Sequence, residues 1–252
     1  MAKVLCIANQ KGGVGKTTTA INLAASMAHL QKRVLLIDID PQGNATTGCG
    51  VDKDGISVGV YQVLIGAYDV KQAVIPLPNL GFSIIGANRS LSGAEVELLD
   101  MDDRDSRLRI ALADIQSEYD YILIDCPPSL SMLTMNALCS CDGVLIPMQC
   151  EFFALEGLSD LVGSVKRIHK EKNPGLRDLS ILRVMFDPRI TLQQQVSEQL
   201  KKHFGDKVFN TIIPRNVRLA EAPSYGVPGL LYDKSSKGAK AYMMLAREML
   251  GE

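Results

Sequence analysis

The sequence contains a segment with the residue types and spacing of a phosphate-binding loop, Lys11-Gly12-Gly13-Val14-Gly15-Lys16-Thr17-Thr18. The glycines let backbone N–H groups approach an anion without obstruction by a Cβ atom. Lys16 can reach the β- and γ-phosphates of a nucleotide, and the Thr17 hydroxyl can ligate Mg²⁺. An apolar run at residues 4–8 precedes the loop and a helical pattern at 20–30 follows it, as such a loop requires. Because Gln10 replaces the first glycine of the pattern G-x-x-x-x-G-K-[ST], a glycine-rich turn without a ligand is the alternative for the loop alone.

Aspartates follow two of the apolar runs. Asp38 ends the run at residues 33–38, Asp40 lies two positions further, and Asp125 ends the run at 121–125. Ligands of open α/β sheets bind at the carboxyl ends of the strands, so these carboxylates are expected beside the loop. Asp125 has the position of a Walker B aspartate and is expected to hold Mg²⁺ through water, with Asp38 supporting the metal shell. Any one of these aspartates could instead cap a helix.

Strands and helices alternate along the chain. Strands are predicted at residues 3–8, 33–38, 82–86, 121–125, 143–148, 179–185 and 208–213. Helices are predicted at 18–30, 58–66, 70–74, 91–99, 131–139, 154–171, 192–204 and 238–250, and a further one is expected to be capped by Asp102 and Asp103 and to end near Glu118. Residues 46–54 are expected to form a loop. The alternation predicts one α/β domain, residues 1–252, with a doubly wound, mainly parallel sheet and helices on both faces.

Composition restricts the class of protein. The chain has 252 residues with 46% hydrophobic content, which is ample for a core. No apolar run reaches the roughly 18 residues of a membrane span, and the first strand starts so early that no signal peptide is expected. Six cysteines lie in or beside apolar segments, which is typical of reduced thiols in a cytoplasmic protein. Their spacing does not match a common zinc or iron–sulfur site.

Charge is distributed unevenly. The net charge is −1, but residues 94–160 hold fourteen Asp and Glu against three Arg, whereas residues 163–218 hold twelve Lys and Arg against five Asp and Glu. Two solvated faces without a partner are one explanation. The other is contact with nucleic-acid phosphates, because the basic segment lacks interleaved aromatic residues for stacking on bases.

A second lysine in the loop, Lys11, indicates which kind of phosphate-binding loop the segment resembles. The segment 11–17 resembles the K-G-G-x-G-K-[ST] loop of the deviant Walker A family of P-loop NTPases. Within that family the chain is most similar to the ParA/Soj ATPases of chromosome and plasmid partitioning. The resemblance extends through Asn9-Gln10, Asp38-Ile39-Asp40-Pro41-Gln42-Gly43-Asn44, Asp125-Cys126-Pro127-Pro128-Ser129, Ala154-Leu155-Glu156-Gly157 and Ile213-Pro214-Arg215-Asn216-Val217-Arg218. Several separate motifs in the same order are more specific than any one of them.

This resemblance implies an ATPase that uses ATP and Mg²⁺ and forms a nucleotide-sandwich homodimer. Lys11 would cross the dimer interface to the partner's nucleotide, and Asp40 would orient or activate the attacking water. Pro214 and Asn216 would bind adenine, and Glu151 would approach the ribose or the partner's loop.

The resemblance also implies DNA segregation. Arg189 and Arg218 match positions that contact DNA backbone in Soj-type proteins, and Lys201 and Lys202 lie between them in the sequence. The ATP-bound dimer would bind double-stranded DNA without sequence preference and release it on hydrolysis. A ParB/Spo0J-like partner with a basic tail would stimulate hydrolysis, in a cytoplasmic, nucleoid-associated system. Val227 departs from the many relatives with lysine there, which removes one basic contact.

Two alternatives remain open at this point. MinD-like proteins end in a basic amphipathic helix that lies on a membrane, whereas the last helix here carries only Lys240 and Arg247 after Gly238 and its apolar face resembles core. A cargo-positioning ATPase switch that scarcely touches DNA is the other alternative, and loss of salt-sensitive DNA binding would favour it.

Overall fold

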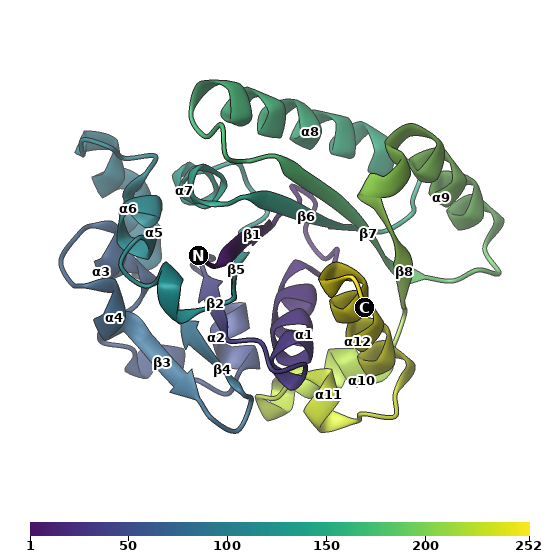
Figure 1. Ribbon diagram of the computed structural model, residues 1–252, viewed down its shortest axis with the longest axis horizontal. Coiled ribbons are helices and arrows are strands. Elements are labelled where there is room, and N and C mark those ends of the chain that lie inside the picture. Colours follow the sequence, from purple (N-terminus) through teal and green to yellow (C-terminus); the bar gives the residue numbers. More distant parts are fainter.

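A computed structural model describes residues 1–252. Its strands are β1 (Lys3–Ile7), β2 (Val34–Asp38), β3 (Val74–Leu77), β4 (Phe82–Ile85), β5 (Tyr121–Asp125), β6 (Gly143–Met148), β7 (Asp178–Phe186) and β8 (Val208–Pro214). They form one eight-stranded sheet in the order β3-β4-β2-β5-β1-β6-β7-β8 (Figure 1). Every neighbouring pair is parallel except β3 and β4. The doubly wound, mainly parallel α/β fold predicted from the sequence is therefore confirmed.

Helices cover both faces of the sheet. They are α1 (Lys16–His29), α2 (Asn44–Gly48), α3 (Val60–Leu64), α4 (Val70–Ala73), α5 (Leu91–Glu97), α6 (Arg107–Leu112), α7 (Met132–Ser140), α8 (Ala154–Glu171), α9 (Thr191–Phe204), α10 (Val217–Glu221), α11 (Gly229–Tyr232) and α12 (Lys237–Leu250). Helices α1 and α12 pack on one face, and α7 and α8 lie on the other (Figure 1). Because both faces are covered, β2 and β6 are buried at every residue and their sequences are almost entirely apolar.

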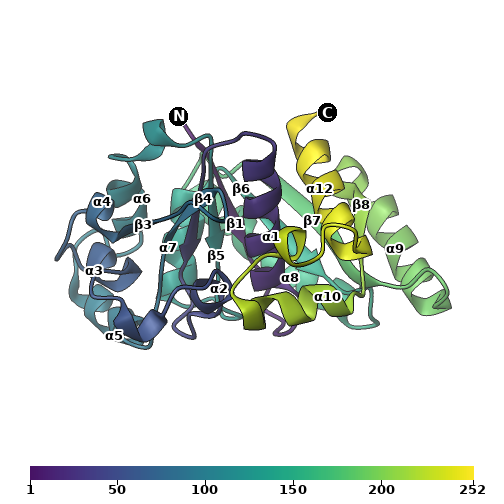
Figure 2. The same cartoon turned by 90° about the horizontal axis from the view of Figure 1, so that it is seen from below.

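The strand register brings the predicted functional segments to one edge of the sheet. Ile7, the last residue of β1, pairs with Asp125 of β5, and Asp125 pairs in turn with Asp38 of β2. The loop that follows β1 therefore lies beside both aspartates. Figure 2 shows α2 and α10 at this edge, while both chain termini lie at the opposite edge.

The structure corrects the prediction in the first half of the chain. Residues 46–54 were expected to be a loop, but α2 occupies part of this range because Thr46 binds the Asp38 carboxylate through its backbone N–H and its hydroxyl. The helix expected to be capped by Asp102 and Asp103 begins only at Arg107, since Asp103 has a left-handed φ of 56° that interrupts a helix. Strand β3 was not predicted, because Pro76 lies within its four residues and proline argues against a strand; its place at the edge of the sheet accommodates Pro76.

The last helix belongs to the core, as expected from its sequence. Tyr242, Leu245 and Ala246 are buried on the face of the sheet that α1 covers. The Tyr242 hydroxyl lies 3.0 Å from the Thr19 hydroxyl of α1, so the two helices also share a hydrogen bond. The apolar face that a MinD-like helix would offer to lipid is thus occupied by protein. None of the helices is both long enough and apolar enough to cross a membrane.

Candidate nucleotide-binding site

The loop between β1 and α1 presents its backbone to open space. Gly13 and Gly15 have left-handed φ angles of 73° and 77°, which glycine adopts without strain. No heavy atom lies within 4 Å of the position that a Cβ atom would take on Gly12 or Gly13. Gly15 begins α1 without a side-chain cap, so the first N–H groups of this helix are free to bind an anion. The loop therefore has the backbone geometry of a phosphate cradle.

Side chains from the neighbouring strands hold the loop in place. The Asn9 side chain accepts a hydrogen bond from the Lys11 N–H at 3.0 Å and donates one to the Pro147 carbonyl of β6 at 2.8 Å. Gln149, just after β6, donates to the Gly13 carbonyl at 3.3 Å. Gln149 was not predicted from the sequence, because no motif marks an amide that reaches the loop only after the strands have aligned.

Lys16 is directed into the site rather than into solvent. Its side chain is buried, with only 7% of the residue exposed, and its Nζ donates to the Lys11 carbonyl at 3.2 Å. Burial lowers the pKa of Lys16, and the negative charges of Asp125 and Asp40 act in the opposite direction. A cation that is desolvated but has few partners is suited to a polyphosphate.

The two aspartates at the strand ends differ in their surroundings. Asp38 is fully buried, and its carboxylate accepts hydrogen bonds from the Thr46 N–H at 2.8 Å, the Thr46 hydroxyl at 2.7 Å and the Asp40 N–H at 3.2 Å. Burial nevertheless raises the pKa of Asp38 to about 6. Asp125 is 1% exposed, and neither of its carboxylate oxygens has a hydrogen-bond partner. Burial first and the charge of Asp38 second raise the pKa of Asp125 well above its usual range.

The donor set around Asp125 fits a hard divalent cation. A buried carboxylate without partners is costly unless a cation or a proton neutralises it. Thr17 and Lys16 are the neighbours that lower the pKa of Asp125, so its carboxylate lies beside the hydroxyl expected to ligate Mg²⁺. Oxygen ligands of this kind are those that Mg²⁺ prefers. Asp38 is committed to Thr46 and Asp40, which suits a supporting role around the metal.

Asp40 lines the cavity in front of the loop. This cavity has a volume of about 620 Å³ and is bounded by the loop glycines, Lys16, Thr17 and Thr18 and by residues that follow the strand ends, among them Pro128 and Met185. The Asp40 carboxylate accepts a hydrogen bond from the Gln42 N–H at 2.9 Å through one oxygen. Its side chain is thus fixed at the wall of the cavity, where a water beside a terminal phosphate would lie.

A smaller cavity of about 180 Å³ adjoins the first and contains the predicted adenine residues. Pro214 and Asn216 line it, together with Gly15, Thr18 and Met185, which border both cavities. The Asn216 side-chain oxygen accepts from the Leu219 N–H at 3.2 Å and caps α10, which leaves its amide N–H groups to donate. The two cavities therefore adjoin through a shared wall, with the glycine loop lining the larger one and Pro214 and Asn216 lining the smaller one.

Lys11 is placed differently from Lys16. Its ammonium is half-exposed and forms an ion pair with Glu151, which follows β6. The two lysines of the loop are therefore placed differently. Lys16 lines the cavity, whereas Lys11 is not among the residues that line it and is paired with Glu151.

The structure separates the predicted DNA residues into two groups. Arg189 follows β7 and Arg218 follows β8, so both lie at the same edge of the sheet as the loop. Each is already paired, Arg189 with Asp187 at 2.6 Å and Arg218 with Glu221 at 2.9 Å. Lys201 and Lys202 lie in the last turn of α9. Lys201 is about 15 Å along α9 from its first residue, Thr191, at 1.5 Å per residue, and Arg189 precedes Thr191. The structure therefore does not gather the four residues into one cluster.

Comparisons with known proteins agree with this geometry. A family described as an AAA domain matches residues 2–178. The chromosome partitioning protein ParA of Myxococcus xanthus is 49% identical over 99% of this chain and 88% of that protein. The sporulation initiation inhibitor protein Soj of Bacillus subtilis is 50% identical over 99% of this chain and 98% of that protein. The crystal structure of cobyrinic acid a,c-diamide synthase from Mycobacterium smegmatis with bound ADP and magnesium is 35% identical, covers 99% of this chain and 94% of that chain, and has a TM-score of 0.87.

The parallel sheet, the glycine loop at the start of α1 and the aspartates beside it define a P-loop NTPase-like fold. Within that class, the full-length similarity to proteins named ParA and Soj shows the family. The chain belongs to the ParA/Soj family of chromosome-partitioning ATPases.

Proposed function

We propose that this protein is a Mg²⁺-dependent ATPase for DNA segregation, and that residues 1–252 act as a single domain. ATP would join two subunits in a sandwich dimer that binds double-stranded DNA without sequence preference. Hydrolysis, stimulated by a ParB-like protein, would release the DNA. The observation that carries the proposal is the different placement of the two lysines of the loop. Lys16 is buried in the cavity, and Lys11 is held outside it by Glu151.

The residues around the cavity suit hydrolysis of a terminal phosphate. Phosphoryl transfer depends mainly on positioning and on stabilisation of charge. The loop N–H groups and Lys16 would bind the phosphates. Thr17 and Asp125 would hold Mg²⁺, whose charge would offset the negative charge of the phosphates. Asp40 would orient the attacking water from the cavity wall. The slot lined by Pro214 and Asn216 would hold adenine.

Lys11 supports a second subunit as part of the site. The Lys11 ammonium has no partner in its own loop, and it pairs with the Glu151 carboxylate outside the cavity lining. An exposed ion pair of this kind contributes about 0–1 kcal/mol, so exchange of Glu151 for the phosphates of a facing nucleotide has a low cost. Lys11 would then reach the partner's nucleotide, and dimer formation and hydrolysis would be linked.

Arg189 and Arg218 are the proposed DNA contacts of each subunit. Both are exposed at the edge that also holds the nucleotide site, and their carboxylate partners are intramolecular. A duplex must displace these carboxylates, so one subunit alone would bind weakly. Two subunits in a sandwich would double the number of phosphate contacts, which multiplies the affinity. A nucleoid-associated location would follow from this binding.

The test is a comparison of nucleotide states. Size-exclusion chromatography should show a dimer with ATP and a monomer with ADP or without nucleotide. A salt titration on two unrelated duplexes should show DNA binding with ATP, a steep fall of affinity with salt, and equal affinities for both sequences. Equal DNA binding with ADP and ATP, or a strong preference for one duplex, would contradict the proposed switch. ATP-dependent dimerisation without DNA binding would favour a cargo-positioning switch instead.

A further inference from the structure

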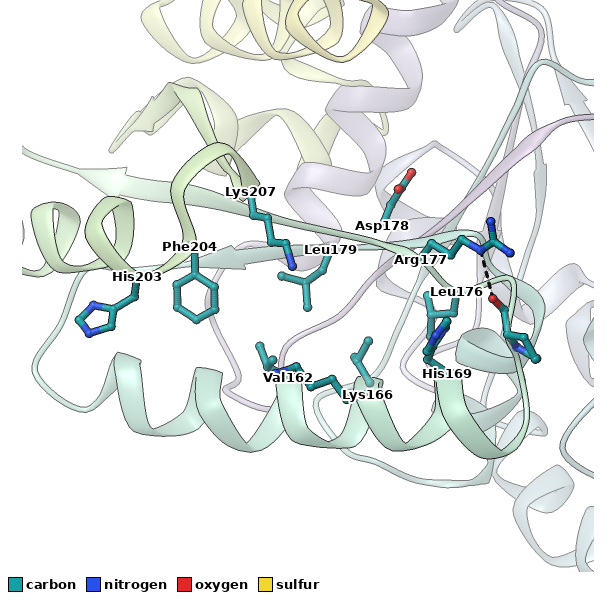
Figure 3. A pocket seen from close by; sticks show the side chains of 12 residues that line it. Val162, Lys166, His169, Leu176, Arg177, Asp178, Leu179, His203, Phe204 and Lys207 are labelled. Atoms are coloured by element: carbon teal, nitrogen blue, oxygen red, sulfur yellow. Dashed lines mark hydrogen bonds between the residues drawn. The ribbon is translucent and has the colours of Figure 1, made fainter.

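A separate groove lies between α8 and the end of α9 (Figure 3). It has a volume of about 740 Å³. Asp178, which begins β7, and Lys207, which directly precedes β8, lie in its wall. The groove is therefore at the amino ends of these strands, whereas the phosphate-binding loop is at the carboxyl edge of the sheet. A ligand in this groove and a nucleotide in the loop would not compete for space.

The floor of the groove is apolar. Val165 and Leu176 are buried beneath it, and Val162, Leu179 and Phe204 are partly exposed in it. Phe204 points from the end of α9 toward α8 in Figure 3. A nucleic-acid backbone has few apolar atoms to pack against these side chains, whereas apolar side chains of a protein segment can bury them.

The rim of the groove carries cations without partners. Lys166, Arg177 and Lys207 are exposed, and none of them forms an ion pair with a carboxylate of the chain. Asp178 is the one carboxylate among the lining residues, and Lys3 pairs with it at 2.9 Å. The Arg177 side chain makes only a long hydrogen bond, 3.4 Å, to the Pro174 carbonyl (Figure 3).

These three cations differ from the two arginines that are proposed to contact DNA. Arg189 and Arg218 are neutralised by their own carboxylates. The positive charge of the groove rim is therefore available to a ligand from outside the chain.

The size of the groove indicates what such a ligand looks like. Val162, Val165, Lys166 and His169 follow one another at i, i+3, i+4 and i+7, so they share one face of α8. Seven residues of helix extend about 10 Å, or two turns. An amphipathic helix laid along this face would bury apolar residues at the same spacing and place its acidic residues opposite the rim.

We infer that the groove between α8 and α9 binds a short acidic amphipathic helix of a partner protein. The apolar floor selects the leucine-like anchors of the helix, and the unpaired cations select its carboxylates. This site goes beyond the proposed ATPase cycle, because it would attach the protein to a second macromolecule without blocking the nucleotide site.

The test uses two fluorescein-labelled peptides of about four helical turns. One contains Leu at i, i+3, i+4 and i+7 among Glu and Ala, and the other is a scrambled peptide of the same composition. Fluorescence anisotropy with the full chain should show saturable binding of the patterned peptide, about tenfold tighter than the scrambled one. The Lys166→Glu/Lys207→Glu variant should bind the patterned peptide about tenfold more weakly, whereas Lys240→Glu on α12 should leave its affinity unchanged. ADP and ATP should give the same peptide affinity.

A second variant tests the apolar half of the site. Val162→Thr keeps the shape of the side chain and adds a hydroxyl, so it should weaken the patterned peptide by about threefold to tenfold. Thermal melting shows whether each variant is folded. Equal binding of patterned and scrambled peptides would overturn the inference. So would a DNA duplex that displaces the peptide and itself loses affinity in Lys166→Glu/Lys207→Glu, since the groove would then be a phosphate-binding surface.

Discussion

Substitution of Asp125 by asparagine should stabilise the metal-free protein while it impairs the nucleotide site. The wild-type carboxylate is 1% exposed, has no hydrogen-bond partner and lies beside the buried carboxylate of Asp38, its register partner on the next strand. A buried group left unsatisfied costs about 1–3 kcal/mol. The asparagine side chain would remove the repulsion and offer its amide to Asp38, so a gain of about 2 kcal/mol is expected, or roughly 4–8 °C in Tm for a chain of this size.

The matched control is Asp38→Asn. Asp38 accepts three hydrogen bonds, two from Thr46 and one from the Asp40 backbone. Both Thr46 donors bind one carboxylate oxygen and the Asp40 N–H binds the other. An amide at position 38 keeps only one oxygen and turns its N–H groups toward either Thr46 or the Asp40 N–H, so this variant should lose about 1–3 kcal/mol of stability. Two neighbouring aspartates with the same substitution are thus expected to give stability changes of opposite sign.

The assay is thermal and urea denaturation in EDTA, repeated with Mg²⁺ and ATP. A ligand at a hundred times its Kd stabilises the folded state by about 2.7 kcal/mol, and the wild type should gain close to this amount. The Asp125→Asn variant should gain much less, because its Mg²⁺ ligand is weakened. If Asp125→Asn destabilises the metal-free protein as much as Asp38→Asn does, the carboxylate has a structural role and the reasoning about the metal site is wrong.

Four further outcomes follow from the site. Lys16→Ala should weaken ATP binding about a hundredfold, since the phosphates lose their buried cation; isothermal titration would refute this by giving wild-type affinity. Asp40→Ala should bind ATP and dimerise but hydrolyse about 10²–10³-fold more slowly, and normal turnover in a phosphate-release assay would remove it from the mechanism. Lys11→Ala should retain some nucleotide binding yet lose the dimer and DNA binding together, as size exclusion and anisotropy would report. Arg189→Ala and Arg218→Ala should each lower the salt slope of DNA binding by about two per dimer without changing ATP affinity, and an unchanged slope would exclude that arginine.

Motifs at the carboxyl ends of buried strands were the ones predictable from the sequence. The loop at residues 11–18 and the strand-end aspartates were placed correctly, because a parallel sheet brings the carboxyl ends of its buried strands to one edge. It was not predictable that Asp38 accepts hydrogen bonds whereas Asp125 has no hydrogen-bond partner. That difference depends on Thr46, which reaches Asp38 only once α2 has folded against the strand. The sequence prediction of a loop at 46–54 missed this contact.

Contacts between segments that are far apart in the sequence account for the other features of the site that were not predicted. Gln149 supports Gly13 from a strand that is more than a hundred residues away in the chain, and Met185 borders both cavities from β7. The basic segment was treated as one cluster because its residues are close in sequence. The length of α9 instead sends Lys201 and Lys202 to one end of the helix and leaves Arg189 at the other.

This separation determines how the proposed DNA binding must work. With Lys201 and Lys202 at the far end of α9, one subunit offers Arg189 and Arg218 to a duplex, and each must first leave its carboxylate. Two phosphate contacts give a slope of log K against log salt of about −2, and four give about −4. A monomer with the shallow slope would bind at the level of weak non-specific association at physiological salt. Tight, salt-sensitive binding therefore requires two subunits on one duplex, and any nucleotide that joins them would control DNA binding without altering a single DNA contact.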